Sequence, residues 1–219
     1  MLIRHAGHAE FVIELESGYR IVTDPFDAGT GYPVRKEKAD AVLVSHHHHD
    51  HDAVENVEGT PQVIDTAGKT TLAQGVSVTA LEGFHDDAQG GKRGKTLLFL
   101  IEAEGLRLVH LGDLGCALDA EQVKALARPD ILMIPVGGFF TIDGKQALET
   151  AKKLGARTVL PMHYKTGYNQ GWPISGPEDF LAGYGEESVI RECEALRVTA
   201  GDLECQPEVV MFKEPGATD

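Results

Sequence analysis

The sequence predicts a protein of the α/β (α+β) class, in which β-sheets are covered by helices. Short apolar, β-branched segments fill the first half of the chain, often as hairpins. After residue 115, such segments alternate with segments of helical periodicity. The 219 residues are 42% hydrophobic, which is enough for a substantial core. We expect a single domain over residues 1–213 and a frayed C-terminal tail over 214–219.

The strands are expected at alternating or continuous apolar runs. Residues 1–5 lead almost directly into the first of them, and Ser17-Gly18 joins the first two as a hairpin. A second pair meets across residues 103–105. In chain order, the expected strands cover residues 10–16, 19–23, 39–44, 62–65, 76–80, 96–102, 106–111, 131–136, 158–162 and 209–212.

Helical periodicity occurs in the second half of the chain. Asp119 opens a helix with the spacing of a capping box. A second helix is expected over about residues 145–154, and Gly155 ends it. A third helix is expected to start at Pro177. These helices separate the later strands, as in sheets that are covered by helices.

Charge and cysteine content limit the partners and the compartment. The net charge of −14 argues against a large nucleic-acid-binding surface but permits a small-molecule substrate, even one that carries phosphate. Cys116, Cys193 and Cys205 lack C-x-x-C spacing, which is typical of reduced thiols in the cytoplasm. No apolar run near 18 residues and no leader pattern occurs, so we expect neither a membrane span nor export. The oligomeric state stays open.

Metal-binding side chains cluster directly after the strand expected at residues 39–44. His46, His48, Asp50 and His51 form the pattern H-x-H-x-D-H. Imidazole nitrogen and carboxylate oxygen are zinc-type ligands, and an open site built from them makes a nucleophile from water. The run therefore indicates a metal-dependent hydrolase.

The histidine run also permits two interpretations without catalysis. It could be an expression tag, although tags lie at termini and this run is internal. It could also be an exposed tract that binds metal weakly. The preceding strand and the Asp-His ending favour a built site. His47 and His49 fall between the motif positions, and we expect them to flank the site rather than bind metal.

Three further candidate ligands each follow an expected strand. His85 comes after the strand at 76–80, Asp113 follows the strand that ends at residue 111, and His163 follows the strand that ends at residue 162. Loops at the carboxyl ends of strands converge to form sites in layered α/β folds. We therefore expect these side chains to join the first cluster.

This ordered set resembles the metallo-β-lactamase superfamily, and within it the compact zinc-dependent hydrolases with lactonase and phosphodiesterase relatives. Besides the ligands, the resemblance rests on AGHAEF from residue 6, DPF from residue 24, HLGDLG from residue 110, PVGGFFTID from residue 135 and PMHYK from residue 161. The resemblance implies a four-layer αββα sandwich with the metal site at one edge of the sheets.

The resemblance also implies a division of the ligands between two metal ions. His46, His48 and His85 would bind the first metal, whereas Asp50, His51 and His163 would bind the second. Asp113 would bridge the two ions. Asp50 and Asp113 are the expected catalytic residues. A ligand set rich in imidazole favours Zn²⁺, although Mn²⁺, Fe²⁺ or Ni²⁺ also suit such a site.

Several further residues near the motifs are candidates for the pocket or for contacts to the ligands. His8 matches a recurrent position of the subgroup, and His110 could hydrogen-bond behind Asp113. Lys165 and the basic run at residues 90–95 could hold a phosphate or carboxylate of the substrate, or could be solvated loop charges.

The predicted function is hydrolysis of a small ester-like bond at a dinuclear, zinc-type centre with a bridging hydroxide. The bond could belong to a lactone, a carboxylic ester or a phosphodiester. Two alternatives remain: a metal-binding scaffold or regulator without turnover, and an iron-dependent oxidoreductase on the same fold.

Overall fold

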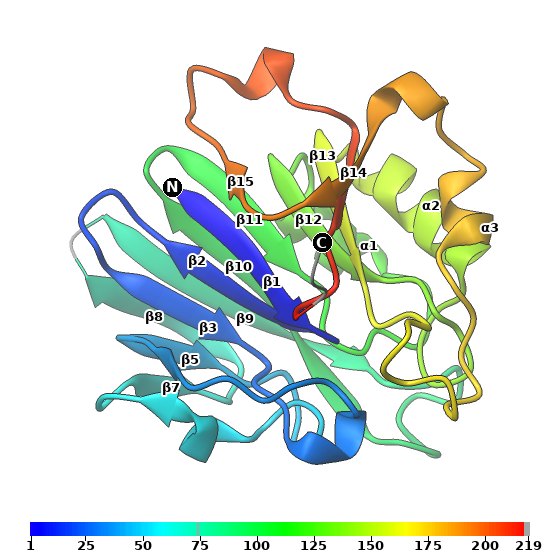
Figure 1. Cartoon of the computed structure of the whole chain (residues 1–219), viewed down its shortest axis with the longest axis horizontal. Helices are drawn as coiled ribbons and strands as arrows, with labels where there is room; N and C mark the ends of the chain where they lie inside the picture. Colours follow the sequence, from blue (N-terminus) through cyan, green and yellow to red (C-terminus); the bar gives the residue numbers. More distant parts are fainter. Residues whose placement is uncertain (74, 217–219) are drawn as a thin grey trace.

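A computed structural model describes residues 1–73 and 75–216, and these residues form two β-sheets stacked face to face (Figure 1). The six-stranded sheet has the spatial order β15 (Leu196–Arg197), β1 (Leu2–Gly7), β2 (Glu10–Glu14), β3 (Arg20–Thr23), β5 (Ala41–Leu43) and β7 (Gln62–Ile64). The eight-stranded sheet has the order β14 (Val189–Cys193), β16 (Val209–Phe212), β13 (Thr158–Met162), β12 (Ile131–Pro135), β11 (Leu106–His110), β10 (Lys95–Ala103), β9 (Val76–Phe84) and β8 (Gly68–Ala73). The predicted fold class is confirmed.

The helices α1 (Ala120–Leu126), α2 (Gly144–Leu154) and α3 (Glu178–Leu181) cover the outer face of the eight-stranded sheet (Figure 1). Capping boxes begin α1 and α2, because a side-chain oxygen of Asp119 or Asp143 accepts a backbone N–H three residues later. The N-terminal capping predicted for the first helix is confirmed.

The outer face of the six-stranded sheet has a different cover. Val12, Val22 and Val42 of that face pack on Val57 and on the short 3-10 helix Val54–Asn56. The ladder β4 (Glu37–Lys38) with β6 (Val57–Glu58) lies in the same region. All three described α-helices pack on the other sheet, so this layer consists of the 3-10 helix, the two-stranded ladder and loops.

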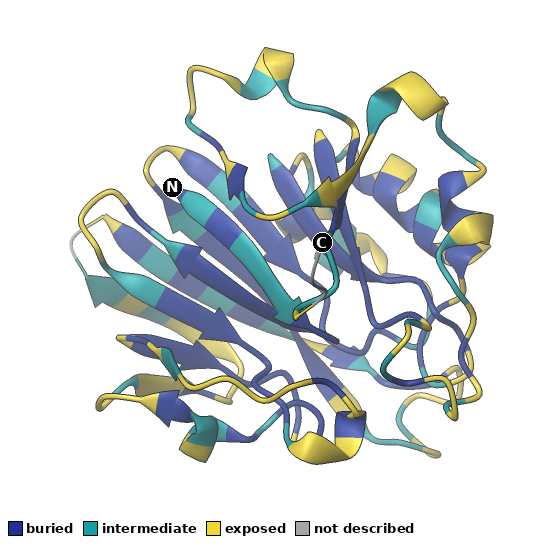
Figure 2. Ribbon diagram, viewed as in Figure 1, coloured by how far each residue is buried: buried dark blue, intermediate teal, exposed yellow. Residues whose placement is uncertain are grey.

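The main core lies between the two sheets, where Figure 2 shows buried residues on the facing strands. Phe11 and Ile21 of the first sheet and Phe99, Leu108 and Met133 of the second have no exposed surface. A fully buried side chain of this size contributes about 1.5–3 kcal/mol to folding. This apolar layer fixes the distance between the sheets and thus between the loops at their edges.

Several strands were missed by the sequence pattern. β1 is a strand of its own and forms a hairpin with β2, whereas we expected the first full strand to begin at residue 10. β8, β14 and β15 were not predicted because each lies at the edge of a sheet. An edge strand has one unpaired side and few buried residues, so its hydrophobic alternation is weak.

Glu214 and Pro215, which we expected in a frayed tail, accept hydrogen bonds from the loop after β13. The backbone N–H of Gly167 donates to Oε1 of Glu214 (3.2 Å), and the Tyr168 hydroxyl donates to the carbonyl of Pro215 (2.6 Å). The rest of the expected tail, 217–219, lies outside the described residues. In the described chain, none of the helices has the length and apolarity needed to cross a membrane.

Glu10 in β2 gives a testable pH effect on stability. Burial raises the pKa of this carboxyl to about 8, so it is protonated in the folded protein at neutral pH and ionised in the unfolded chain. Between about pH 5 and 8 this group should therefore lower the free energy of unfolding by about 1.4 kcal/mol per pH unit as the pH rises. Urea denaturation at about pH 5 and about pH 8 measures this fall in the free energy of unfolding, and Glu10→Gln should abolish it. The exposed Glu16→Gln is the control, and parallel pH profiles for wild type and Glu10→Gln would contradict the assignment.

Strands of both sheets have their carboxyl ends at one edge of the sandwich. β3 and β5 are parallel, and β1 runs in the same direction because β2 is antiparallel to both of its neighbours. In the second sheet β9, β11, β12 and β13 likewise share one direction. The loops after these strands carry the candidate ligands, as expected for layered α/β folds.

Candidate metal centre

Backbone hydrogen bonds join the two sheets at this edge. The N–H of His163 donates to the carbonyl of His8 (3.0 Å), and the N–H of Leu97 donates to the carbonyl of Ser45 (2.8 Å). His8, Asp24, Phe139 and His163 all have positive φ although none is glycine. Such strained conformations persist only where the surrounding structure enforces them, and they often occur at functional sites.

His46, His48 and His85 form the first group of ligand atoms, all within 4.8 Å of one another. Nε2 of His46 lies 3.0 Å from Nδ1 of His48. The Ser45 hydroxyl donates to Asp24 and accepts from Nδ1–H of His46 (2.9 Å). In this tautomer, Nε2 of His46 carries the lone pair and can bind a cation. The loop after β5 and the end of β9 thus bring three imidazoles together.

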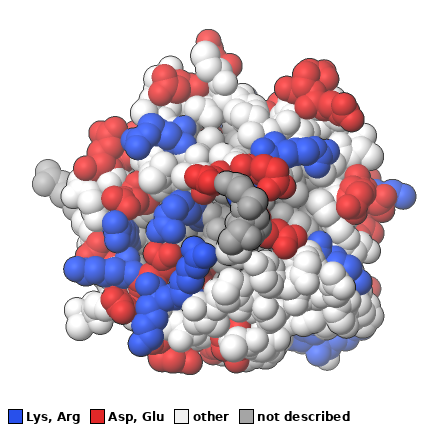
Figure 3. All heavy atoms as spheres, in the orientation of Figure 1, with Lys and Arg blue, Asp and Glu red and all other residues white. Residues whose placement is uncertain are grey.

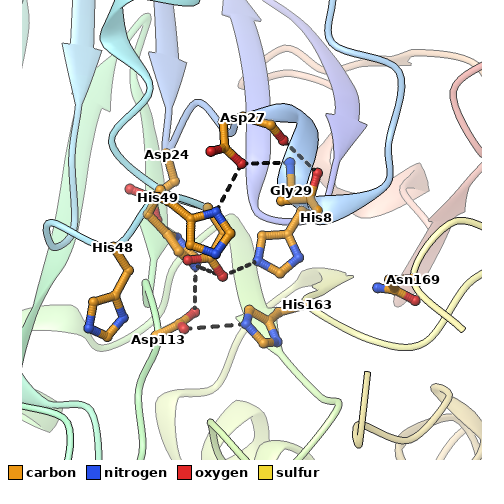
Figure 4. Close-up of polar contacts among 12 residues, drawn as sticks. His8, Asp24, Asp27, Gly29, His48, His49, Asp113, His163 and Asn169 are labelled. Carbon is orange, nitrogen blue, oxygen red and sulfur yellow. Dashed lines mark hydrogen bonds and ion pairs between the residues drawn. The ribbon is translucent and has the colours of Figure 1, made fainter. Parts of the chain in front are cut away.

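Asp50, His51 and His163 form the second group, and His8 joins it. Nε2 of His51 lies 3.6 Å from Oδ2 of Asp50. Nε2–H of His8 donates to the same carboxylate oxygen of Asp50 (3.1 Å; Figure 4). The structure therefore brings together the residues expected around a second metal, with one additional imidazole that orients Asp50.

Asp113 lies between the two groups. Its Oδ2 is 3.3 Å from Nε2 of His163 (Figure 4) and 3.3 Å from Nε2 of His85, and its Oδ1 is 3.3 Å from Nε2 of His51. Oδ2 is also 3.9 Å from Nε2 of His46. A carboxylate in this central position can contact cations on both sides, which is the geometry that bridging requires.

The turn that carries Asp113 depends on a close approach of the two sheets. A Cβ on Gly112, whose φ is +49°, would lie 2.5 Å from Oγ1 of Thr96 and 2.7 Å from the Cβ of Ser45. The Thr96 hydroxyl oxygen accepts the N–H of Asp113 (3.2 Å). His110 accepts the N–H of Gly112 at Nδ1 (3.1 Å) and donates from Nε2 to the carbonyl of Ala9 (3.0 Å). The His110 side chain therefore supports the turn by hydrogen-bonding backbone atoms of Gly112 and Ala9, and not by contacting the Asp113 carboxylate.

The surroundings of Asp113 and Asp50 favour ionised carboxylates, and those of His46 favour a neutral imidazole. Burial alone would raise the pKa of Asp113, but His163 and His51 hold it well below its usual range. Burial opposes ionisation of Asp50 too, while His8 and His51 lower its pKa. Burial lowers the pKa of His46 to about 3, so its ring is neutral and offers a lone pair. This is the protonation state that metal ligands require.

His51 has the opposite tendency in the metal-free protein. Burial lowers its pKa, but the nearby carboxylates of Asp113 and Asp24 raise it well above the usual value for histidine. A cation bound at Nε2 would replace the proton there and satisfy the same carboxylates, so metal binding should release a proton.

Unpaired buried atoms support a cation between these groups. Among the described residues, His51 Nε2, His163 Nε2 and Asp113 Oδ1 are buried without a hydrogen-bond partner. Buried polar atoms are almost always paired, and exceptions at a functional site indicate an ion or a water. Because these atoms converge and belong to zinc-type ligands, the residues fit a metal centre.

Asp24 contacts the candidate ligands and was not predicted to belong to the site. Fully buried after β3, its carboxylate accepts Nδ1–H of His51 (2.9 Å), the Ser45 N–H (2.7 Å) and the Ser45 hydroxyl (2.7 Å). This contact fixes the His51 tautomer that leaves Nε2 free, in the manner of carboxylate–histidine–metal sites. Its signal in the sequence was the Asp-Pro-Phe stretch from residue 24, which carries part of the resemblance but was given no role at the site.

The remaining candidates lie farther from the ligand atoms. Lys165 is exposed and does not line the cleft, so the structure does not bring it to the ligands. His47 and His49 are exposed at the rim, where Nδ1 of His49 contacts Oδ1 of Asp27 (2.9 Å; Figure 4). His8 lies within the second group, and His110 lies in the turn before Asp113.

A cleft of about 540 Å³ opens over the ligand atoms. Its floor includes His85, Asp113 and His163, and its wall includes Phe140 and Trp172. This volume is typical of sites for small molecules. The two aromatic side chains lie 5.9 Å apart between ring centroids and give the wall an apolar surface beside the polar floor.

Comparisons with known proteins agree with this geometry. The family described as beta-lactamase superfamily domain matches residues 2–163. A protein of Thermococcus onnurineus named UPF0173 metal-dependent hydrolase is 30% identical over 217 residues, which cover 86% of this chain and 94% of the relative.

Solved structures of metallo hydrolases are also similar to this chain. A Thermotoga maritima protein, provisionally assigned as a Zn-dependent hydrolase of the metallo-β-lactamase superfamily, has 36% identity and a TM-score of 0.77, covering 96% of this chain and 97% of that one. Igni18, a metallo hydrolase of Ignicoccus hospitalis, has a TM-score of 0.68 over 100% of this chain and 97% of its own. At 24% identity, Igni18 supports the fold alone.

Proposed function

The chain belongs to the beta-lactamase superfamily domain family and is a metal-dependent hydrolase, and from this premise we propose that it cleaves a small ester-like substrate at a dinuclear centre. His46, His48 and His85 would hold one ion. Asp50, His51 and His163 would hold the other, with Asp113 between them. The imidazole-rich set favours Zn²⁺.

The observation that carries the proposal is the division of the ligand atoms into two groups around one carboxylate. Asp113 is within 3.3 Å of imidazole nitrogens from both groups, so a single side chain can contact two cations. When bound, a metal pair supplies a water activated at neutral pH and polarises the carbonyl or phosphoryl oxygen of the substrate.

The surrounding residues would fix the ligands and the substrate. Asp24 and Ser45 hold the tautomers of His51 and His46, and His8 orients Asp50. These contacts leave little freedom to the ligand side chains, so the site is preorganised. Phe140 and Trp172 would cover the apolar part of a substrate in the cleft and reduce its access to bulk water.

We also propose a small-molecule substrate rather than a nucleic acid. On the face in Figure 3, Lys and Arg side chains lie beside Asp and Glu rather than in a continuous basic surface. Arg4 pairs with Glu37 (3.0 Å) and Arg20 with Glu14 (3.0 Å). The chain carries a net charge of −14, which opposes phosphate backbones. We also propose a cytoplasmic location, because Cys116, Cys193 and Cys205 are all free thiols.

Turnover and metal content measured together test this function. Protein loaded with Zn²⁺ should contain two ions per chain by mass spectrometry of the metal, and should hydrolyse at least one of bis(para-nitrophenyl) phosphate, para-nitrophenyl acetate and γ-butyrolactone. A chelator should remove the activity, and added Zn²⁺ should restore it. Two bound ions with no hydrolysis of a broad ester and phosphodiester panel would favour a scaffold. Redox turnover with iron would favour an oxidoreductase.

A further inference from the structure

The basic run at residues 90–95 contains one cation that differs from its neighbours. The ammonium group of Lys92 pairs with Asp87 (2.6 Å), and that of Lys95 pairs with Glu82 (2.8 Å). The guanidinium of Arg93 has no acidic partner among the residues that the structure describes. Arg93 is also the sole Lys or Arg among the described residues that line the cleft.

Two aromatic rings hold the Arg93 side chain. Its guanidinium carbon lies 5.3 Å from the ring centroid of Phe140 and 5.8 Å from that of Phe139. Cation–π contacts of this kind fix the plane of a guanidinium while its N–H edges stay available. Arg93 lines the same cleft as His85 and Asp113, so a ligand in that cleft lies beside its side chain.

The loop that carries Arg93 is preorganised by one buried carboxylate. Asp86 accepts the backbone N–H of Ala88 (2.7 Å), Gly90 (2.9 Å), Lys92 (2.9 Å) and Arg93 (2.7 Å). Asp86 directly follows His85, so a single segment positions a metal ligand and the free cation.

An aromatic wall connects Arg93 with the ligands. Phe140 lies 5.9 Å from Trp172, and Trp172 lies 5.3 Å from His8 and 6.3 Å from His163, between ring centroids. Phe139 continues the wall outward and is 62% exposed, with a positive φ of 60°.

We propose, on the basis of the hydrolase function above, that Arg93 binds an anionic oxygen group of the substrate while Phe140 and Trp172 pack on its apolar part. The substrate class is therefore an ester with a carboxylate or phosphate beside an apolar or aromatic group. A planar guanidinium donates two parallel hydrogen bonds to such a group, and its charge has no acidic partner among the described residues. Arg93 determines specificity.

A matched pair of phenyl esters tests the role of Arg93. The substrate para-acetoxybenzoate carries a carboxylate, and para-acetoxybenzamide is its neutral counterpart. With Zn²⁺-loaded protein, Arg93→Met should lower kcat/KM for the benzoate by about 10- to 100-fold, mainly through KM, and change the value for the benzamide by less than about twofold. For Arg93→Lys, kcat/KM for the benzoate should lie between the values of wild type and Arg93→Met. Lysine keeps the positive charge but cannot donate two parallel hydrogen bonds.

Lys92→Met is the control, because its charge is already paired with Asp87 outside the cleft. An equal loss for both esters in Arg93→Met, or no loss for either, would overturn the proposal. A phosphate arm, para-acetoxyphenyl phosphate against neutral para-acetoxybenzamide, identifies the anion: a larger loss in that arm assigns Arg93 to phosphate and a larger loss in the benzoate arm assigns it to carboxylate.

A binding measurement separates failure of this inference from failure of the proposed function. If wild type hydrolyses none of these substrates, the hydrolase proposal fails on this panel, and calorimetric titration with para-hydroxybenzoate and para-hydroxybenzamide decides the role of Arg93. Wild type should prefer the benzoate, and Arg93→Met should lose that preference. Equal preference in wild type and variant, or no binding to either protein, would overturn the role of Arg93.

Discussion

Replacing Asp113 by asparagine is expected to lower kcat/KM by about 10³-fold or more and to leave at most one tightly bound metal ion per chain. The carboxylate lies 3.3 Å from imidazole nitrogens of His51, His85 and His163, so it contacts both ligand groups. An amide has the same shape but no charge, and its NH₂ group cannot bind a cation. The loss of several kcal/mol of charge stabilisation accounts for the size of the effect.

Metal content and steady-state kinetics on the same samples measure this effect. Asp65→Asn is a matched control, because Asp65 is an exposed aspartate after β7 and should keep wild-type values. Two ions per chain with wild-type turnover in Asp113→Asn would remove Asp113 from the bridging position. Thermal denaturation without metal shows whether the fold survives the change.

Replacing Asp24 by asparagine is expected to weaken metal binding by about 10- to 100-fold although Asp24 is not among the proposed ligands. Its carboxylate accepts three hydrogen bonds, from His51 Nδ1–H and from the N–H and hydroxyl of Ser45. An amide nitrogen in this fully buried position would face a donor, and the His51 tautomer would no longer be fixed. The free energy of unfolding should also fall, by about 3 kcal/mol.

Competition with a chromophoric chelator measures the affinity, and urea denaturation of the metal-free protein measures the stability. Asp40→Asn is the control, because Asp40 also accepts a backbone N–H at the end of a strand but is exposed and far from the ligands in the fold. Ser45→Ala should give a smaller loss of affinity and serves as the test if the Asp24 variant does not fold. Wild-type affinity in both variants would contradict the role of this network.

The sequence was sufficient for the parts of the protein that depend on local pattern. Buried strands such as β12 and β13 are continuous apolar runs, and α2 begins at a capping box and ends at a glycine, so each could be recognised within about ten residues of chain. The H-x-H-x-D-H motif is local too. His85, Asp113 and His163 could be selected because each follows a recognisable strand.

Only the tertiary structure decided which side chains act on those ligands. Asp24 precedes His51 by 27 residues, and nothing in its local sequence separates a buried acceptor from an ordinary strand-ending aspartate. Arg93 and its paired neighbours Lys92 and Lys95 are equivalent in sequence, and only the position of Phe140 and of the partner acids distinguishes them. The physical reason is that hydrogen bonds, burial and charge pairing arise from distances in space, whereas periodicity and capping arise from neighbours along the chain.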